Sequence, residues 1–135
     1  MKRQFNIFIS SGDFHSNLRR QICIDIDKHN SKEIRDFLFA NRKEFRIVAE
    51  RVLTLSNMYY DRYKREFKNS SGTQVTAFTF FDIQNTRIYC QEMTNHEGEF
   101  FIICAKLFDK KSQKNNKTNK PLLENIASYE YSHKP

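Results

Sequence analysis

The 135-residue sequence has only three glycines, three cysteines and no long apolar run, and each shortage excludes a class of protein. So few glycines leave no glycine-rich loop to cradle the phosphates of a nucleotide. The cysteines are odd in number and lack Cys-x-x-Cys spacing, which predicts buried thiols and argues against a disulfide framework. No stretch approaches the roughly 20 apolar residues of a membrane span.

The four histidines and the first ten residues add further exclusions. No His pairs with another His or with a Cys at metal-ligand spacing, so the sequence predicts no metal site, and nothing in it predicts a cofactor. In the opening segment MKRQFNIFIS, Asn6 interrupts the apolar stretch, whereas a secretory signal needs an apolar core of about 7–15 residues. We therefore expect a cytoplasmic protein with no attachment to a membrane.

Aromatic and basic residues are what the chain has in quantity. Thirteen Phe and six Tyr can fill the core of one domain, predicted over residues 1–135. Lys and Arg number 23 against 16 Asp and Glu, a net charge of +7 that favours a polyanionic partner. Six of the lysines fall within residues 106–120, together with the single acid Asp109. That segment is either a binding surface or a solvated loop.

Alternating apolar residues in the first part of the chain predict strands at residues 4–10 and 21–27. The connection is either a hairpin through SSGD or a helix that starts at Asn17–Arg20. Asn30, with Glu33 three residues later, is typical of a helix start. Apolar residues then recur at three- and four-residue spacing over residues 31–56, which predicts an amphipathic helix with a break near residues 40–41.

The second part of the chain predicts a helical continuation over residues 57–68, where tyrosines recur at helical spacing. β-branched and aromatic residues then predict strands at 75–81, 86–93 and 99–107, arranged as an antiparallel meander. Pro121 suits the first turn of a final helix. The predicted fold class is α+β, with an N-terminal helical part packed on a small antiparallel sheet and a C-terminal helix.

Two segments carry a resemblance to a known family. The stretch RIYC (Arg87–Cys90) is followed by a hairpin, the apolar strand FFIICAKLF, the run DKKSQK (Asp109–Lys114) and a short helix. This succession resembles the end of the phage-derived, HigB-like branch of the RelE toxin superfamily, over about residues 57–131. The resemblance implies a single RelE/HigB-like domain over residues 1–135, with a RelE/ParE-like fold.

The resemblance also implies a function. Members of the family are toxins of toxin–antitoxin pairs, similar to ribosome-dependent mRNA endonucleases that cleave RNA without a metal. The implied partners are a cognate antitoxin, mRNA and the ribosome. Two alternatives stay open: a ParE-like toxin that blocks a protein target, and a phage or mobile-element accessory protein that binds nucleic acid without catalysis.

Arg87 is the first candidate for a catalytic role, because the planar guanidinium makes bidentate contacts to phosphate. The alternative for Arg87 is an ion pair with Glu92 or Glu99. Tyr89 shares its face of the strand and could stack on a base or pack in the core. The remaining catalytic candidates are Lys111 and His133; His133 could act as a general acid or base, or belong to a frayed tail. The candidates for binding RNA phosphates are Lys106, Lys110, Lys111, Lys114 and Lys117.

Overall fold

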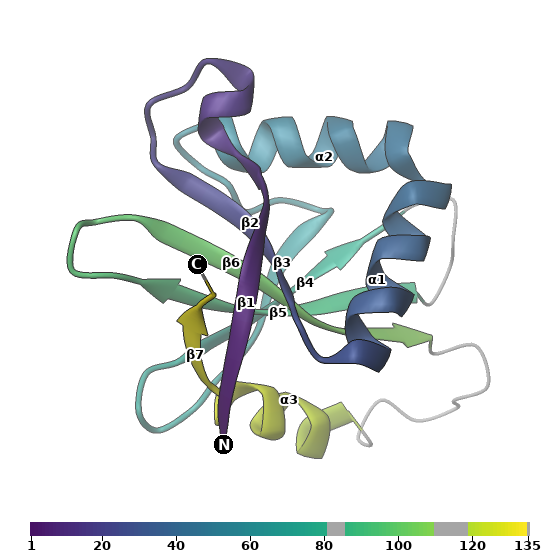
Figure 1. Ribbon diagram of the computed structural model, residues 1–135, viewed down its shortest axis with the longest axis vertical. Coiled ribbons are helices and arrows are strands. Elements are labelled where there is room, and N and C mark those ends of the chain that lie inside the picture. Colours follow the sequence, from purple (N-terminus) through teal and green to yellow (C-terminus); the bar gives the residue numbers. More distant parts are fainter. Residues whose placement is uncertain (81–85, 110–118, 135) are drawn as a thin grey trace.

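The computed structural model describes residues 1–80, 86–109 and 119–134. Its elements are β1 (Lys2–Ser10), a short 3-10 turn η1 (Ser11–Phe14), β2 (Arg20–Asp25), α1 (Lys28–Ala40), α2 (Arg42–Thr54), β3 (Tyr63–Lys68), β4 (Gln74–Thr79), β5 (Thr86–Thr94), β6 (Phe100–Asp109), α3 (Asn119–Ala127) and β7 (Glu130–His133). The strands form one sheet in the order β3-β4-β5-β6-β2-β1-β7 (Figure 1).

The sheet is mixed. The N-terminal hairpin β1–β2 is antiparallel, as is the series β3-β4-β5-β6. A parallel pairing of β2 with β6 joins the two halves, and β7 adds to the outer side of β1 in parallel (Figure 1). The predicted fold class is therefore wrong. Two strands precede the helices, the sheet has seven strands of mixed direction, and the chain returns to the sheet after α3.

The helix pair confirms the predicted amphipathic helix and its break. α1 ends at Ala40 and is capped by Asn41, whose side-chain amide donates to the carbonyl of Phe37 at 2.9 Å, and α2 follows at once. The predicted cap at Asn30 is wrong by three residues. The cap is Asp27, whose carboxylate accepts from the backbone N–H of Asn30.

Two segments predicted from local pattern form strands instead. Residues 63–68 are β3 and not a helix, because Tyr63 pairs with Phe78 of β4 and is fully buried against it. The predicted frayed tail is β7, held to the sheet by the buried phenol of Tyr131. In both cases, burial against residues that are distant in the sequence outweighs the secondary-structure preference of the segment itself.

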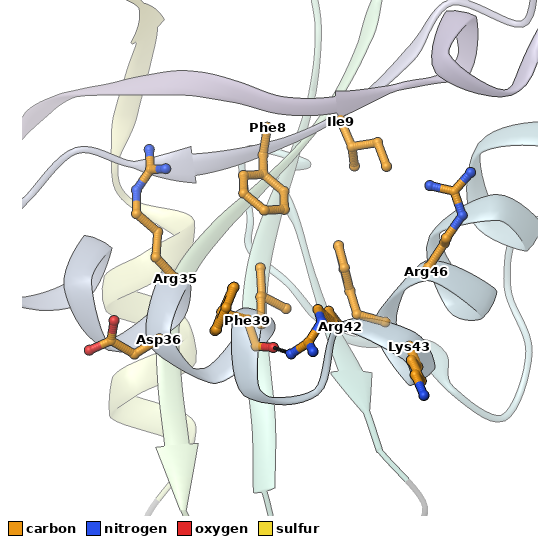
Figure 2. A pocket seen from close by; sticks show the side chains of 10 residues that line it. Phe8, Ile9, Arg35, Asp36, Phe39, Arg42, Lys43 and Arg46 are labelled. Carbon is orange, nitrogen blue, oxygen red and sulfur yellow. Dashed lines mark hydrogen bonds between the residues drawn. The ribbon is translucent and has the colours of Figure 1, made fainter.

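The corner between α1 and α2 leaves a groove beside β1 (Figure 2). We call it the α1–α2 groove. It has a volume of about 720 Å³. Its lining residues are Phe8, Ile9, Arg35, Asp36, Leu38, Phe39, Arg42, Lys43, Phe45 and Arg46.

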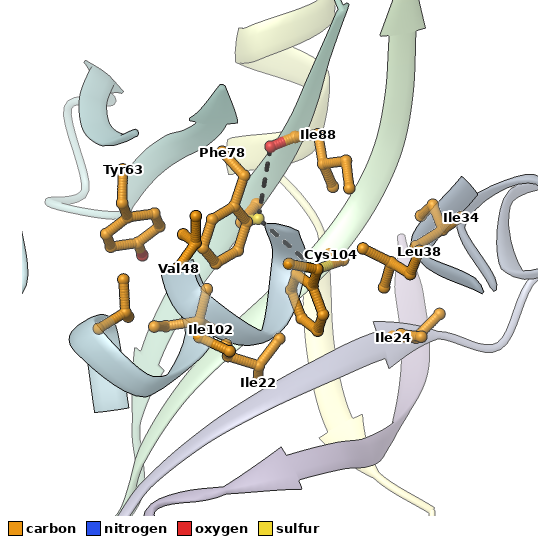
Figure 3. Close-up of a cluster of buried hydrophobic side chains, with 14 of the residues drawn as sticks. Ile22, Ile24, Ile34, Leu38, Val48, Tyr63, Phe78, Ile88, Ile102 and Cys104 are labelled. Carbon is orange, nitrogen blue, oxygen red and sulfur yellow. Dashed lines mark hydrogen bonds between the residues drawn. The ribbon is translucent and has the colours of Figure 1, made fainter. Parts of the chain in front are cut away.

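Each face of the sheet carries a core. On one face, α1 and α2 pack Leu38 and Val48 against Ile24, Phe78 and Cys104 of the strands (Figure 3). On the other face, α3 packs against a second group. Its buried members include Phe5, Cys23, Tyr89, Ile103, Ile126 and Tyr131.

The three cysteines are buried and unbridged, which confirms the prediction made from their number and spacing. Cys90 and Cys104 face each other across β5 and β6, with sulfur atoms 3.8 Å apart. Burial raises the pKa of the Cys23 and Cys90 thiols. Within the described residues, no helix is both long enough and apolar enough to cross a membrane.

Candidate functional site

Strand β5 presents Arg87 and Tyr89 on the α3 side of the sheet, as the predicted alternation requires. Ile88 and Cys90 belong to the core under α1 and α2, and Tyr89 belongs to the core under α3. Gln91 continues the α3 side, because its amide donates to the carbonyl of Ile126 at 2.8 Å. Arg87 pairs in register with Thr79 of β4 and Phe108 of β6, so it stands at the end of the sheet where β6 finishes.

The Arg87 guanidinium is half-buried, and its Nε is buried without a hydrogen-bond partner in the described part of the chain. The ion pairs considered for it are not formed. Glu92 accepts from the hydroxyls of Tyr59 and Tyr63, and Glu99 accepts from Gln21 and Asn95. A buried donor without a partner costs about 1–3 kcal/mol, and such a group calls for a specific explanation.

Tyr89 combines a packed ring with a polar tip. Its ring is tilted against that of Phe108 at 5.7 Å, and the residue is 2% exposed, so the ring faces are closed to a base. Its hydroxyl accepts from the Asn119 side-chain amide at 3.1 Å. Burial raises the pKa of Tyr89, the Glu66 carboxylate raises it further, and the Arg87 guanidinium opposes both. The phenol therefore stays protonated at neutral pH.

Two residues that the sequence prediction missed complete this arrangement. Asn119 is the first residue of α3 and is buried, and its Oδ1 has no hydrogen-bond partner among the described residues. Glu66 is exposed and lies in the bulge of β3 between Arg65 and Phe67. We call the group of Arg87, Tyr89, Asn119 and Glu66 the Arg87 cluster.

Counting only the described residues, the Arg87 cluster offers one donor and one acceptor without a hydrogen-bond partner, together with a protonated hydroxyl and an exposed carboxylate. A ligand that offers an acceptor to Arg87 and a donor to Asn119 would satisfy both unpartnered atoms. A phosphodiester with a neighbouring hydroxyl has both kinds of group. The cation favours the phosphate oxygens, and the carboxylate favours the hydroxyl hydrogen.

Lys106 does not join this cluster. In the pairing of β5 with β6, which shifts register between Tyr89 and Cys90, Lys106 stands opposite Tyr89. Its ammonium nevertheless donates to the Asn30 side chain of α1 at 3.4 Å, and not to a member of the Arg87 cluster. The Lys106 ammonium is therefore directed toward α1.

His133 lies far from Arg87 across the sheet. Its ring stacks on that of Phe5 at 5.3 Å, on edge strand β7. β7 is four strands from β5, which at about 4.8 Å for each step is roughly 19 Å. The predicted Lys110, Lys111, Lys114 and Lys117 lie outside the described residues. The described chain stops at Asp109, which pairs with Thr86, and resumes at Asn119.

Comparison of the chain with protein-family models, curated proteins and solved structures finds no match.

Proposed function

We propose that this protein cleaves RNA by attack of a ribose 2′-hydroxyl on the adjacent phosphate, with the Arg87 cluster as its active site. The observation that carries the proposal is the buried, unpartnered Nε of Arg87 beside the Tyr89 hydroxyl and near the Glu66 carboxylate. A guanidinium held in this way has a hydrogen-bond donor reserved for an anion, because no carboxylate of the described residues occupies it.

The chemistry divides among the members of the cluster. Glu66 accepts the proton of the 2′-hydroxyl as its oxygen attacks phosphorus, which is the work of a general base. The new O2′–P bond forms and the P–O5′ bond breaks, leaving a 2′,3′-cyclic phosphate and a 5′-hydroxyl that takes its proton from solvent. Arg87 binds the non-bridging oxygens, whose negative charge grows in the transition state.

Tyr89 and Asn119 hold the substrate in place. The Tyr89 hydroxyl accepts from Asn119, so its own hydrogen is available for a phosphate oxygen. The unpartnered Oδ1 of Asn119 can accept from a ribose hydroxyl. Both residues are buried, so these groups have little freedom to rotate.

We further propose that the cleavage serves as the toxin activity of a toxin–antitoxin pair. The support is the resemblance of Arg87-Ile88-Tyr89 and of the Asp109–Lys114 run to HigB-like toxins, in which Arg87 occupies the first position of the motif. The proposed substrate is mRNA on the ribosome, and the proposed partner is an acidic antitoxin.

The test of the chemistry is cleavage of a labelled single-stranded RNA, with and without ribosomes. We expect products ending in 2′,3′-cyclic phosphate, and no cleavage where the attacking 2′-hydroxyl is replaced by hydrogen. Arg87→Ala and Glu66→Gln should each lower the rate by about 10²–10³-fold. Arg65→Ala and Glu97→Gln are matched controls, because Arg65 lies over the Tyr59 ring and Glu97 is exposed in a turn. Cleavage that survives Arg87→Ala, or a folded wild type that cleaves in neither condition, would overturn the proposal.

Growth on induced expression in bacteria separates the toxin from its alternatives. Arrest that Arg87→Ala abolishes, with the variant still folded, supports a toxin that acts through this cluster. Arrest by both proteins would indicate a ParE-like toxin that blocks a protein target. Growth without arrest would indicate an accessory protein that binds nucleic acid.

A further inference from the structure

The α1–α2 groove has an apolar floor that is open to solvent. Phe39 on α1 is 70% exposed and Phe8 on β1 is 42% exposed, and the two side chains point toward each other across the groove (Figure 2). Ile9, Leu38 and Phe45 extend the floor down to the core. Large aromatic side chains left in water at the mouth of one groove are typical of a contact surface.

The rim of this groove is basic. Arg35, Arg42, Lys43 and Arg46 line it together with a single acid, Asp36. Asp36 is already paired with Lys32, at 2.7 Å. Arg35 and Arg46 stand at opposite ends of the groove (Figure 2). The positive charge is therefore spread along the whole length of the apolar floor.

None of the four rim cations forms an ion pair with a carboxylate in the described ranges 1–80, 86–109 and 119–134. Arg42 donates to the carbonyl of Phe39 at 3.1 Å and lies over its ring, and Arg46 lies over the ring of Phe14. Arg35 donates to the hydroxyl of Ser31. Their charges remain available to acidic groups that approach from outside.

We propose that the α1–α2 groove binds an acidic amphipathic helix of a partner protein. Apolar side chains spaced at i, i+3 or i+4, and i+7 would enter between Phe8 and Phe39, and acidic residues on both sides would reach the rim cations. The volume of about 720 Å³ falls within the range of roughly 300–1,000 Å³ typical of ligand clefts. This inference does not depend on the proposed cleavage of RNA.

Charge and chemistry decide against other occupants. A second copy of this chain, with net charge +7, would bring like charges onto the rim. An RNA strand would meet a floor of Phe, Ile and Leu without polar groups for its base edges, and the Arg42 guanidinium already lies over the Phe39 ring, where a base would stack. The groove also opens on the face of the sheet opposite the Arg87 cluster, away from any RNA bound there.

The test is the binding of labelled model helices to the full chain, followed by fluorescence anisotropy. One peptide has Leu at the i, i+3, i+4 and i+7 positions and Glu on both flanks, and the second keeps the Leu residues but has Lys in place of Glu. A uridine oligonucleotide is the third probe. We expect the acidic peptide to bind, with an affinity that falls as salt is added, and the basic peptide to bind at least tenfold more weakly.

Point variants test whether the acidic peptide binds in the α1–α2 groove. Phe39→Ser should weaken the acidic peptide about tenfold or more, as loss of an interface anchor does, and Lys43→Glu should weaken it to a similar degree. Ile47→Ser is the matched control, because Ile47 lies on α2, is 69% exposed and does not line the groove. Failure of the acidic peptide to bind, equal binding by Phe39→Ser, or displacement of the peptide by the oligonucleotide would overturn the proposal.

Discussion

Removing the charge of Asp25 should destabilise the protein by several kcal/mol. Asp25 is 1% exposed on β2. Its carboxylate accepts from Arg3 Nε at 2.6 Å and Nη2 at 3.0 Å, from the Tyr131 hydroxyl at 2.5 Å and from the Asp27 backbone N–H at 2.7 Å. One carboxylate therefore ties β1, β2 and β7 together. Its hydrogen bond raises the pKa of Arg3, and together with burial it raises that of Tyr131.

The substitution Asp25→Asn keeps the shape of the side chain but turns one acceptor oxygen into a donor. Arg3 then keeps its charge in a nearly buried position without its partner. Breaking a buried ion pair from one side costs about 3–5 kcal/mol. With a urea dependence of about 2 kcal/mol/M for a chain of this size, the midpoint of unfolding should fall by roughly 1.5–2.5 M.

Urea unfolding followed by circular dichroism measures the change, and Asp27→Asn supplies the control. Asp27 also approaches Arg3, at 3.7 Å, but is exposed, and Asn caps a helix as well as Asp does. The substitution Asp27→Asn should lower the free energy of unfolding by less than about 1 kcal/mol. If Asp25→Asn cost no more than Asp27→Asn, the reasoning that the buried pair holds these strands would be refuted. Hydrogen exchange should show the largest loss of protection in β7, the edge strand beside β1.

Three further predictions concern buried groups. Burial raises the pKa of Glu92, so the folded state binds its proton more tightly than the unfolded state. The stability of the wild type relative to Glu92→Gln should therefore rise as pH falls from neutral toward the ordinary carboxyl pKa, which urea midpoints across that range would check. The buried cysteines should react with a thiol reagent only after unfolding, and rapid reaction in the native protein would contradict their burial. Leu53→Ala should cost about 2–5 kcal/mol in the same urea assay, whereas Leu55→Ala, at an exposed position, should change stability by less than about 0.5 kcal/mol.

Local pattern predicted the elements whose burial has a regular period. β1, β2 and the meander β4–β6 follow from alternating apolar residues, and α1 and α2 follow from helical spacing. β3 was missed because Tyr59, Tyr60 and Tyr63 fit a helix as well as a strand in isolation. The segment forms a strand because Tyr63 pairs with Phe78 of β4. The parallel pairing of β2 with β6 could not be predicted, because the residue pattern of a strand does not indicate which distant strand pairs with it.

The candidate site was also predicted only in part from local pattern. Alternation in β5 placed Arg87 and Tyr89 on one face, and the structure has them there. Glu66 was missed because it fell within the segment predicted as a helix. Asn119 was missed because the helix start was placed at Pro121. Lys106 was expected near phosphate, but its long side chain donates to Asn30 at the start of α1, a contact between distant segments that alternation within one strand does not reveal.

The parallel pairing of β2 with β6 sets the order in which the chain can fold. Ile22 meets Ile102, so a loop of about 80 residues must close, at an entropic cost near 4 kcal/mol, against about 2 kcal/mol for the hairpin that pairs Ser10 with Gln21. The β1–β2 hairpin and the β3–β6 meander can each form from neighbouring segments. The β2–β6 pairing cannot be completed until residue 104 has left the ribosome. Until then the apolar edge of β2 is unpaired. Folding should therefore be limited by a late joining of two preformed halves.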